Sequence, residues 1–335
     1  MECWPHRSKR EFINMIQQCE AQGYDIIGDV HGCALALKLL LVRLGYSKRN
    51  GVYFHPRRKI VFLGDIIDRG PRIREALHLV RDMVDAGNAH IVMGNHEYNY
   101  LSYSTSGESV HMPYLREHTS RHQRILQQTL DQLANHPRDQ QDFYQWMMKL
   151  PVFLEFEKFR VVHACWHKEI IAKMLSTTGG NTINPEFLYH SAVRDTFEWT
   201  VMDRLLRGTQ IRLPNNETMT CRDGFVRKFF RTKFWQKSPE LYGDVVFQPD
   251  PLPANMVNRV LSKQEQDDLY YYAHDEKTLF IGHYWCEGVP APLTGNIACL
   301  DYSAVKFGKL VAYRYDFEQV LQADKFVSVD VRTEV

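Results

Sequence analysis

The sequence of 335 residues lacks a CxxC pair, an apolar run of the roughly 18 residues that span a membrane, and a large net charge of either sign. Its seven cysteines are scattered and odd in number, which argues against a disulfide framework or a structural zinc site and favours reduced thiols. Residues 1–9 contain no apolar core of a signal peptide. We therefore expect a soluble, cytoplasmic protein that does not act at a membrane.

The charge balance excludes one mode of binding. Lys and Arg number 41 against 40 Asp and Glu, a formal net charge of +1 in an ordinary globular composition. Proteins that bind nucleic acid mainly by counterion release are more basic or carry a concentrated basic patch, so we expect no strong nucleic-acid surface. The sequence does not indicate the oligomeric state. Histidine, the commonest metal ligand, is plentiful, with fifteen residues.

A pattern of apolar strand, polar turn and helix occurs three times in the first hundred residues. Each apolar run ends at a glycine followed by an acid or its amide: Gly28-Asp29, Gly64-Asp65 and Gly94-Asn95. Such repeats predict parallel βαβ units, and ligands of parallel sheets bind beyond the carboxyl ends of the strands. We therefore expect the three turns to meet at one edge of a sheet.

Signals for regular structure weaken after residue 168 and return with an apolar run at Leu279–Ile281. We interpret residues 1–335 as a single domain. Its core covers about 24–163 and 278–316, and about 168–275 form a helical or irregular insertion or cap.

Further elements are expected on either side of the insertion. Helical spacing extends over Glu117–Asn135 and Asp139–Leu150, and Val152–Val162 is typical of a hairpin. Ile297–Asp301 and Leu310–Tyr315 predict a second, closing hairpin.

Oxygen and imidazole side chains follow five of the expected strands: Asp29, His31, Asp65, Asn95, His163 and His283. A single Gly-Asp is commonly only a turn, and a single histidine is commonly structural, but the ordered combination is specific. Donors of this kind without thiolate suit Mn, Fe, Zn or Ni better than Cu(I) or an iron–sulfur cluster. Six ligands exceed one tetrahedral zinc site and suit two divalent metal ions that share a carboxylate.

The motifs GDVHG at 28–32, GDIIDRG at 64–70 and GNHE at 94–97, followed by His163 and His283, resemble the calcineurin-like metallophosphoesterases. Within that superfamily they are similar to the phosphoprotein (serine/threonine) phosphatase branch, of bacterial or phage type. The resemblance implies an α/β fold, a four-layer α-β-β-α sandwich. It also implies the metal ligands: Asp29, His31 and Asp65 for the first ion, and Asp65, Asn95, His163 and His283 for the second, with Asp65 bridging.

The chemistry expected of such a site follows from the residue types. Two metal ions about 3.5–4 Å apart acidify a bridging water, so we expect direct attack of a metal-bridging hydroxide on the phosphoryl group. Arg69 is suited to hold two phosphate oxygens. His96 would act as the general acid for the leaving group, and Asp68 would orient its imidazole and favour the charged form.

The chain departs from the branch pattern after two of the histidines. Ala164-Cys165 follow His163, where the protein-phosphatase branch often has two glycines. His-Ala is common in bacterial, phage and dinucleoside-tetraphosphatase relatives. Tyr284 follows His283 where many other metallophosphoesterases have a further histidine. Cys165 is interpreted either as a thiol behind the ligands or as a site of oxidation.

The basic and aromatic run Phe225–Trp235 has three interpretations. Alternation predicts an amphipathic strand whose basic face is solvated, which we favour. Alternatively, Arg227 or Arg231 lies over the metal ions as a second phosphate clamp, or the run stacks single-stranded nucleic acid.

Phosphate monoesters are the substrates expected first, either phosphoserine and phosphothreonine or a small phosphoester. The alternative is hydrolysis of a dinucleoside polyphosphate or of phosphate at RNA ends, because the closing segment with Asp301 and Gly308 resembles enzymes of both kinds. Asp68 and Glu97 favour the protein-phosphatase pattern. A non-catalytic binding module is a third interpretation, which the complete ligand set disfavours.

Overall fold

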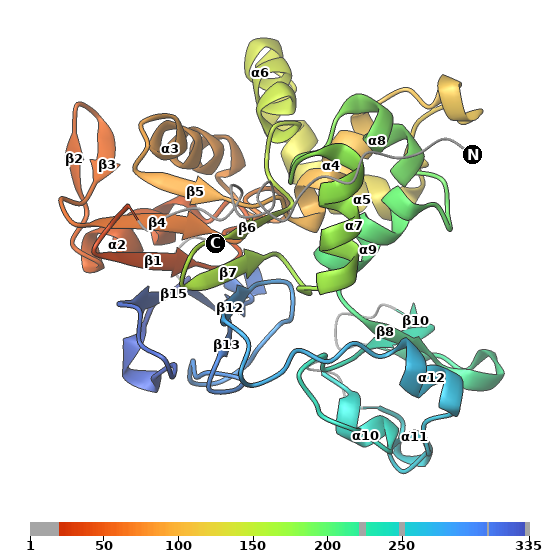
Figure 1. Ribbon diagram of the computed structural model, residues 1–335. Coiled ribbons are helices and arrows are strands. Elements are labelled where there is room, and N and C mark those ends of the chain that lie inside the picture. The colour runs from red at the N-terminus through yellow and green to blue at the C-terminus, as the bar shows by residue number, and fades with distance from the viewer. Residues whose placement is uncertain (1–19, 221–225, 248–251, 307, 332–335) are drawn as a thin grey trace.

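The computed structural model describes residues 20–220, 226–247, 252–306 and 308–331. Two β-sheets form its centre (Figure 1). The first sheet has the strand order β14-β15-β1-β4-β5, with β16 beside β15, and the second has the order β13-β12-β7-β6. The first comprises β1 (Gly23–Ile27), β4 (Arg58–Phe62), β5 (Ala89–Ile91), β14 (Asp301–Tyr302), β15 (Lys309–Tyr315) and β16 (Phe326–Asp330). The second comprises β6 (Phe153–Glu155), β7 (Phe159–Val162), β12 (Thr278–Ile281) and β13 (Ile297–Cys299).

The strands that lead into the polar motifs are parallel, as the sequence predicts. Strand β1 pairs with β4 and β4 with β5 in the first sheet, and β7 pairs with β12 in the second. Parallel neighbours place their carboxyl ends at the same edge of a sheet. The residues that follow these five strands therefore converge.

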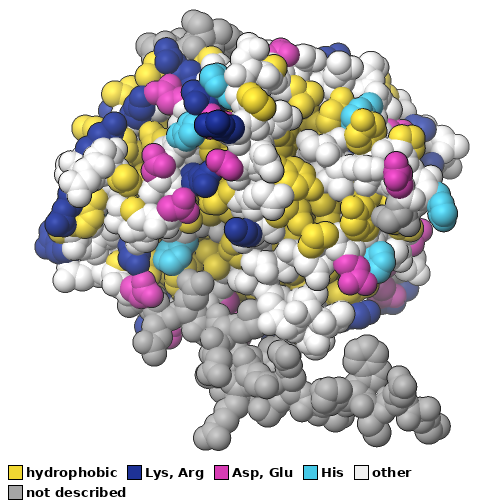
Figure 2. All heavy atoms as spheres, turned by 90° about the horizontal axis from the view of Figure 1, so that it is seen from above, with side chains coloured by type: hydrophobic (Ala, Val, Ile, Leu, Met, Phe, Trp, Pro, Cys, Tyr) yellow, Lys and Arg dark blue, Asp and Glu magenta, His cyan; other side chains and the backbone are white. Residues whose placement is uncertain are grey.

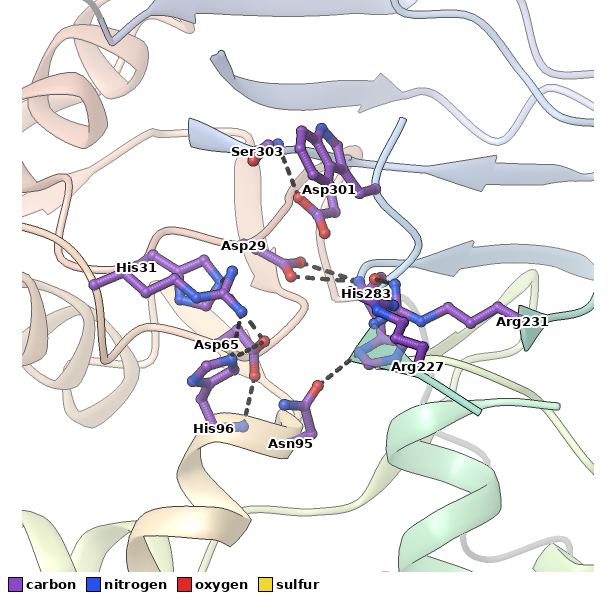
Figure 3. A pocket seen from close by; sticks show the side chains of 12 residues that line it. Asp29, His31, Asp65, Asn95, His96, Arg227, Arg231, His283, Asp301 and Ser303 are labelled. Atoms are coloured by element: carbon purple, nitrogen blue, oxygen red, sulfur yellow. Dashed lines mark hydrogen bonds and ion pairs between the residues drawn. The ribbon is translucent and has the colours of Figure 1, made fainter. Parts of the chain in front are cut away.

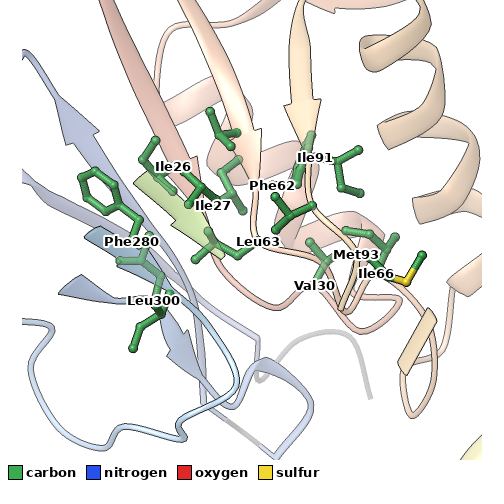
Figure 4. Packing of buried hydrophobic residues seen from close by; sticks show 14 of the residues in the cluster. Ile26, Ile27, Val30, Phe62, Leu63, Ile66, Ile91, Met93, Phe280 and Leu300 are labelled. Carbon is green, nitrogen blue, oxygen red and sulfur yellow. The ribbon is translucent and has the colours of Figure 1, made fainter. Parts of the chain in front are cut away.

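The core lies between the two sheets (Figure 4). Ile26, Phe62 and Leu63 of the first sheet are completely buried, as is Phe280 of the second, and Leu300 is 1% exposed. Burial of each such side chain contributes about 1.5–3 kcal/mol. The apolar runs that predicted the strands are thus also the residues that fasten the two sheets together.

Helices α2 (Ala34–Arg43) and α3 (Ile73–Asp85) pack on the first sheet, where α2 contacts β15 and β16 and α3 contacts β5. Helix α3 buries one stripe at helical spacing: Ile73, Ala76, Leu77, Val80 and Met83. The expected α/β class and α-β-β-α sandwich are confirmed.

A second group of helices lies at the right of Figure 1. It comprises α4 (Asn95–Ser104), α5 (Ser120–Leu133), α6 (Pro137–Met147), α7 (Lys168–Thr178), α8 (Pro185–Ser191) and α9 (Phe197–Arg207). The two helices predicted after residue 117 are confirmed as α5 and α6. The hairpin predicted before residue 163 is confirmed as the antiparallel pair β6 and β7.

The predicted closing hairpin is wrong in its first half. Strand β13 belongs to the second sheet, where it runs parallel to β12, and only β14 pairs antiparallel with β15. The chain changes sheets at Leu300, between β13 and β14. A continuous apolar run cannot reveal this change, because both sheets bury the same kinds of side chain.

The part of the chain expected to be an insertion contributes to two cores. Helices α7, α8 and α9 bury apolar side chains in the main core. A second hydrophobic cluster is formed by residues of β8 (Gln210–Arg212), β9 (Met219–Thr220), β11 (Phe229–Arg231), α10 (Tyr242–Val245) and α11 (Ala254–Val257), together with Leu213, Leu252 and Leu261. Strand β10 (Val226–Arg227), which pairs with β9, and α12 (Lys263–Asp268) belong to the same part of the chain. We propose that the chain is one domain and that only this second cluster, at the lower right of Figure 1, forms the cap.

The remaining strands, β2 (Ser47–Arg49) and β3 (Val52–Phe54), form an antiparallel hairpin at the left of Figure 1. Among the described residues, no helix has both the length and the apolar character that crossing a membrane requires. Basic and acidic side chains are interspersed over the left half of the face in Figure 2, in keeping with the net charge of +1.

Gly28 directly follows β1 and lies against Leu300, where the chain passes from the second sheet to the first. A Cβ atom at this position would lie 2.0 Å from the carbonyl oxygen of Leu300. The backbone N–H of Gly28 donates to the carbonyl of Val311 at 3.0 Å. Backbone atoms cannot move aside as the end of a flexible side chain can. The position therefore requires glycine for close packing.

Gly28→Ala is expected to lower the free energy of unfolding by about 2 kcal/mol, because the added methyl group separates the sheets. Urea denaturation of the full chain measures the change. Gly180→Ala is the matched control, since nothing lies within 4 Å of a Cβ there, and it should change stability by less than about 0.5 kcal/mol. Equal effects of the two substitutions would contradict the packing argument.

Candidate functional site

The turns after the parallel strands adopt a backbone conformation that L-residues rarely take. Positive φ angles occur at six non-glycine residues around the edge where the strands end: His31 (44°), Asp65 (51°), Asp68 (70°), Arg69 (70°), His283 (61°) and Ser303 (52°). Each such residue costs of order 1–3 kcal/mol and persists only where its surroundings impose it. This accumulation of strain marks the edge as a candidate functional site.

Two glycines allow the turns to touch. A Cβ on Gly64, whose φ is +88°, would lie 2.4 Å from the backbone nitrogen of Gly94, and one on Gly282 would lie 2.2 Å from a carboxylate oxygen of Asp29. The first contact joins two turns of the first sheet. The second brings the end of β12 against the carboxylate that follows β1, so both sheets contribute to one site.

The six side chains predicted to hold metal ions converge at this edge. Figure 3 shows five of them, Asp29, His31, Asp65, Asn95 and His283. Asp65 Oδ2 lies 3.8 Å from His31 Nε2 and 3.4 Å from His163 Nε2. Asn95 Oδ1 lies 3.1 Å from His163 Nε2 and 2.6 Å from His283 Nδ1. The carboxylate of Asp29 lies 3.3–3.4 Å from the backbone nitrogen of His283.

The donor atoms form two groups that could each hold a metal ion. His31, Asp65 and His96 form one, and Asp29, Asp65 and His163 form the other, with all ligand atoms of a group within 4.8 Å of one another. Asp65 belongs to both, as a bridging carboxylate must. In these groups His96 takes the place that was expected for Asp29 beside His31, and Asp29 joins His163. The assignment of each ligand to one of the two ions is therefore a proposal.

The orientation of two histidines fits a metal site. His31 Nδ1 lies 2.8 Å from the carbonyl of Ile67, and His163 Nδ1 lies 2.7 Å from that of Leu63. Each carbonyl can only accept, so Nδ1 carries hydrogen and Nε2 faces the site. Metal-binding histidines are commonly fixed by such a bond from their second nitrogen.

The buried charges of the site also fit cations. Burial and the neighbouring Asp301 raise the pKa of Asp29 well above its usual range. Burial acts against the charge of His163, but the Asp65 carboxylate outweighs it and raises the pKa of His163 to about 10. Burial likewise opposes ionisation of Asp65, yet His163 and His96 hold its pKa well below the usual range. The carboxylates thus attract positive charge strongly, which divalent ions would supply.

A role that the sequence interpretation missed belongs to Glu97. Its carboxylate accepts hydrogen bonds from the backbone N–H groups of Asp65 and Ile66 at 2.8 Å and of Gly94 at 3.0 Å. Burial, with the charge of Asp65, raises the pKa of Glu97 to about 7. The sequence signal for this role is the glutamate of the GNHE motif. Two of its partners, Asp65 and Ile66, lie in another turn and could not be identified from spacing.

His96 and Asp68 are in contact, with Nδ1 and Oδ2 2.5 Å apart. Thr129 of α5 donates to the other oxygen of Asp68. Burial lowers the pKa of His96 to about 3 and raises that of Asp68 to about 8, which does not favour the charged imidazole expected from the sequence. Since Arg69 can only donate, the 3.1 Å contact from its Nη2 leaves His96 Nε2 as an acceptor in this state.

Three arginines line the same pocket. Arg69 contacts His31 Nε2 at 3.3 Å through its Nη1, and Arg227 and Arg231 enter from the opposite side (Figure 3). Arg231 Nη1 donates to the carbonyl of His283 at 2.9 Å, and burial lowers its pKa. The favoured interpretation of a solvated basic face is therefore wrong for Arg227 and Arg231, because both line the pocket. Arg227 lies in β10, which pairs with β9, and Arg231 lies in β11, which pairs with β8.

The pocket has further lining residues that were not predicted: Trp285, Asp301 and Ser303. Asp301 accepts a hydrogen bond from the N–H of Ser303 at 2.9 Å. Cys165 is fully buried and burial raises its pKa to about 12, which favours the structural interpretation over a site of oxidation. The four cysteines among the described residues are free thiols: Cys33, Cys165, Cys286 and Cys299.

Comparison with known proteins agrees with this geometry. A family model described as calcineurin-like phosphoesterase matches residues 24–213, more than half of the chain. The chain is 36% identical over 152 residues to bis(5'-nucleosyl)-tetraphosphatase PrpE [asymmetrical] of Oceanobacillus iheyensis, covering 44% of this chain and 58% of that protein. It is 43% identical over 82 residues to the protein of the same name from Bacillus subtilis, covering 23% of this chain and 34% of that protein. Each match spans less than two thirds of the relative.

A solved structure of a cold-active protein tyrosine phosphatase is similar in fold, with a TM-score of 0.51 and 17% identity. The alignment covers 92% of this chain and 82% of that chain. At this level of identity the likeness concerns the fold alone.

Asp65→Asn is expected to abolish binding of a pair of metal ions while the fold stays intact, because one neutral amide cannot replace the shared carboxylate. Calorimetric titration with Mn²⁺ should show fewer bound ions, and turnover of p-nitrophenyl phosphate should fall about 100- to 1,000-fold. Asp267→Asn, at an exposed position of α12, serves as the control. Ion binding and turnover at the original level in Asp65→Asn would refute a shared carboxylate.

Proposed function

The chain belongs to the calcineurin-like phosphoesterase family, and from this premise we propose that it is a metal-dependent hydrolase of dinucleoside polyphosphates. One observation supports this choice above the others, namely that three guanidinium groups line a single pocket together with Trp285. A phosphate monoester carries up to two charges, whereas a polyphosphate chain offers oxygens to several arginines at once. The indole can stack on a nucleobase, a contact worth about 1–3 kcal/mol.

The names of the similar bacterial proteins agree with the second of the two substrate classes expected from the sequence. The other class, which the sequence favoured, is a phosphoprotein or a small monoester. The lining of the pocket, which includes Arg227, Arg231 and Trp285, gives a reason to prefer the nucleotide.

In this proposal Asp29, His31 and Asp65 hold one divalent ion, and Asp65, Asn95, His163 and His283 hold the other. When bound, the two ions would neutralise the phosphoryl oxygens and supply an activated water for direct attack. Arg69 would bind the phosphoryl group that is transferred, and Arg227 and Arg231 would bind phosphates that flank it. His96, held at Nδ1 by Asp68, is neutral before substrate binds. It would take up a proton as the anionic substrate binds and give that proton to the departing oxygen.

A substrate panel tests the proposal. Full-length protein reconstituted with Mn²⁺ is assayed on diadenosine tetraphosphate, a phosphoserine peptide and a 2′,3′-cyclic nucleotide. We expect kcat/KM for the tetraphosphate to exceed that for the peptide at least about tenfold, the effect of one additional charge-assisted bond. A reversed order would establish the phosphoprotein substrate, and inactivity on all three with Mn, Fe, Zn and Ni would support the binding module.

The proton-donor role of His96 predicts a dependence on the leaving group. His96→Asn should lower kcat for a phosphate ester with an alkyl leaving group by about 10²–10⁴, and should affect p-nitrophenyl phosphate much less, since that leaving group needs little protonation. His136→Asn, an exposed histidine at the start of α6, is the control. An equal loss on both esters would show that His96 does not protonate the leaving oxygen.

A further inference from the structure

A second pair of arginines lies beside the site, on the side of helix α4. Arg207, the last residue of α9, donates from Nη2 to Asn99 Oδ1 at 3.0 Å. Asn99 follows Asn95 by one turn of the helix, which separates such side chains by about 5–6 Å. The guanidinium also lies 5.8 Å above the ring of Tyr98. Arg207 is therefore fixed one helical turn from the proposed metal ligand.

Arg116 reaches the same region from the loop that follows α4. Its backbone N–H donates to the carbonyl of Ser102 at 3.1 Å. The loop is held further by His118, whose ring stacks between those of Tyr103 at 3.7 Å and Tyr114 at 3.8 Å. These contacts keep the Arg116 backbone against the end of α4 and make its position part of the fold.

The two arginines carry more positive charge than their surroundings neutralise. Among the described residues, no carboxylate forms an ion pair with Arg116, and Arg207 has one at 3.5 Å from Asp203. Burial and the neighbouring charge of Arg207 lower the pKa of Arg116 to about 10, so Arg116 stays cationic at neutral pH. Two half-buried guanidiniums that repel each other are stabilised by an anion between them.

The location of this pair relative to the reaction follows from its neighbours. The charge of Arg116 acts on both Asp68 and His96, the pair from which the leaving oxygen would receive its proton. Arg227 and Arg231 enter the pocket on the side of His283 (Figure 3). Arg116 is thus placed toward the part of a substrate that departs.

We infer that Arg116 and Arg207 form a subsite for a second phosphoryl group, carried by the leaving part of the substrate. The inference rests on the proposed function, because only a condensed phosphate has a second phosphoryl group within a few bonds of the first. It assigns the two arginines to binding and not to chemistry. A monoester of an alcohol would leave this subsite unused.

The test measures binding of inorganic tripolyphosphate and of orthophosphate to the full-length protein by calorimetry, with and without Mn²⁺. In Arg116→Gln and Arg207→Gln, the ratio of the two dissociation constants should shift about tenfold against tripolyphosphate, the effect of losing a charge-assisted hydrogen bond. Arg138→Gln removes an equal charge from an exposed position of α6 and should leave the ratio unchanged.

Lysine at each position provides a second variant that keeps the charge and the packing of the stem. Arg116→Lys and Arg207→Lys should shift the ratio by less than the glutamine variants, with unchanged thermal unfolding. An unchanged ratio in all four variants, or an equal loss of both ligands, would overturn the subsite. Should the ratio shift as expected while diadenosine tetraphosphate is not hydrolysed, the proposed substrate fails and the subsite stands.

Discussion

One buried carboxylate holds the two central turns of the site together, and the remaining geometry depends on it. Glu97 accepts hydrogen bonds from the N–H groups of Asp65 and Ile66 in one turn and of Gly94 in the next. These bonds compensate for the burial of its charge. Because Asp65 and Asn95 adjoin the bonded amides, Glu97 fixes how far apart the shared carboxylate and the neighbouring amide oxygen stand. A longer or shorter side chain could not satisfy both turns.

The strained turns and the glycines are two consequences of the same crowding. Carboxylates and imidazoles from two sheets must approach within hydrogen-bond distance, which leaves no room for a Cβ at Gly282 and forces Asp65 and His283 into the left-handed region. This strain is balanced by the apolar core directly beneath, where Ile27 and Leu63 are completely buried. The site is therefore rigid because the sheets below it are tightly packed.

The sequence predicted the features of the site that local pattern encodes. An apolar run that ends in Gly-Asp specifies strand, turn and side chain together, so the convergence of Asp29 and Asp65 could be inferred without coordinates. Contacts across long separations could not be inferred: Thr129 lies 61 residues from Asp68, and Arg231 lies 52 residues from His283, to whose carbonyl it donates. The hairpin error has the same origin, since Leu300 joins two sheets that bury similar residues.

Charge explains how a protein with a net charge of +1 could bind the polyanion that we propose as its substrate. The attraction is local: three carboxylates, Asp29, Asp65 and Asp301, favour cations at the base of the pocket, while Arg69, Arg227 and Arg231 favour anions at its walls. Neither set would be stable alone, because like charges buried together raise each other's cost. The two sets line the same pocket and stabilise each other there, and a phosphoryl group bound in it would contact both the metal ions and the guanidiniums. Specificity for a longer anion must then come from whichever arginines lie beyond the first phosphate.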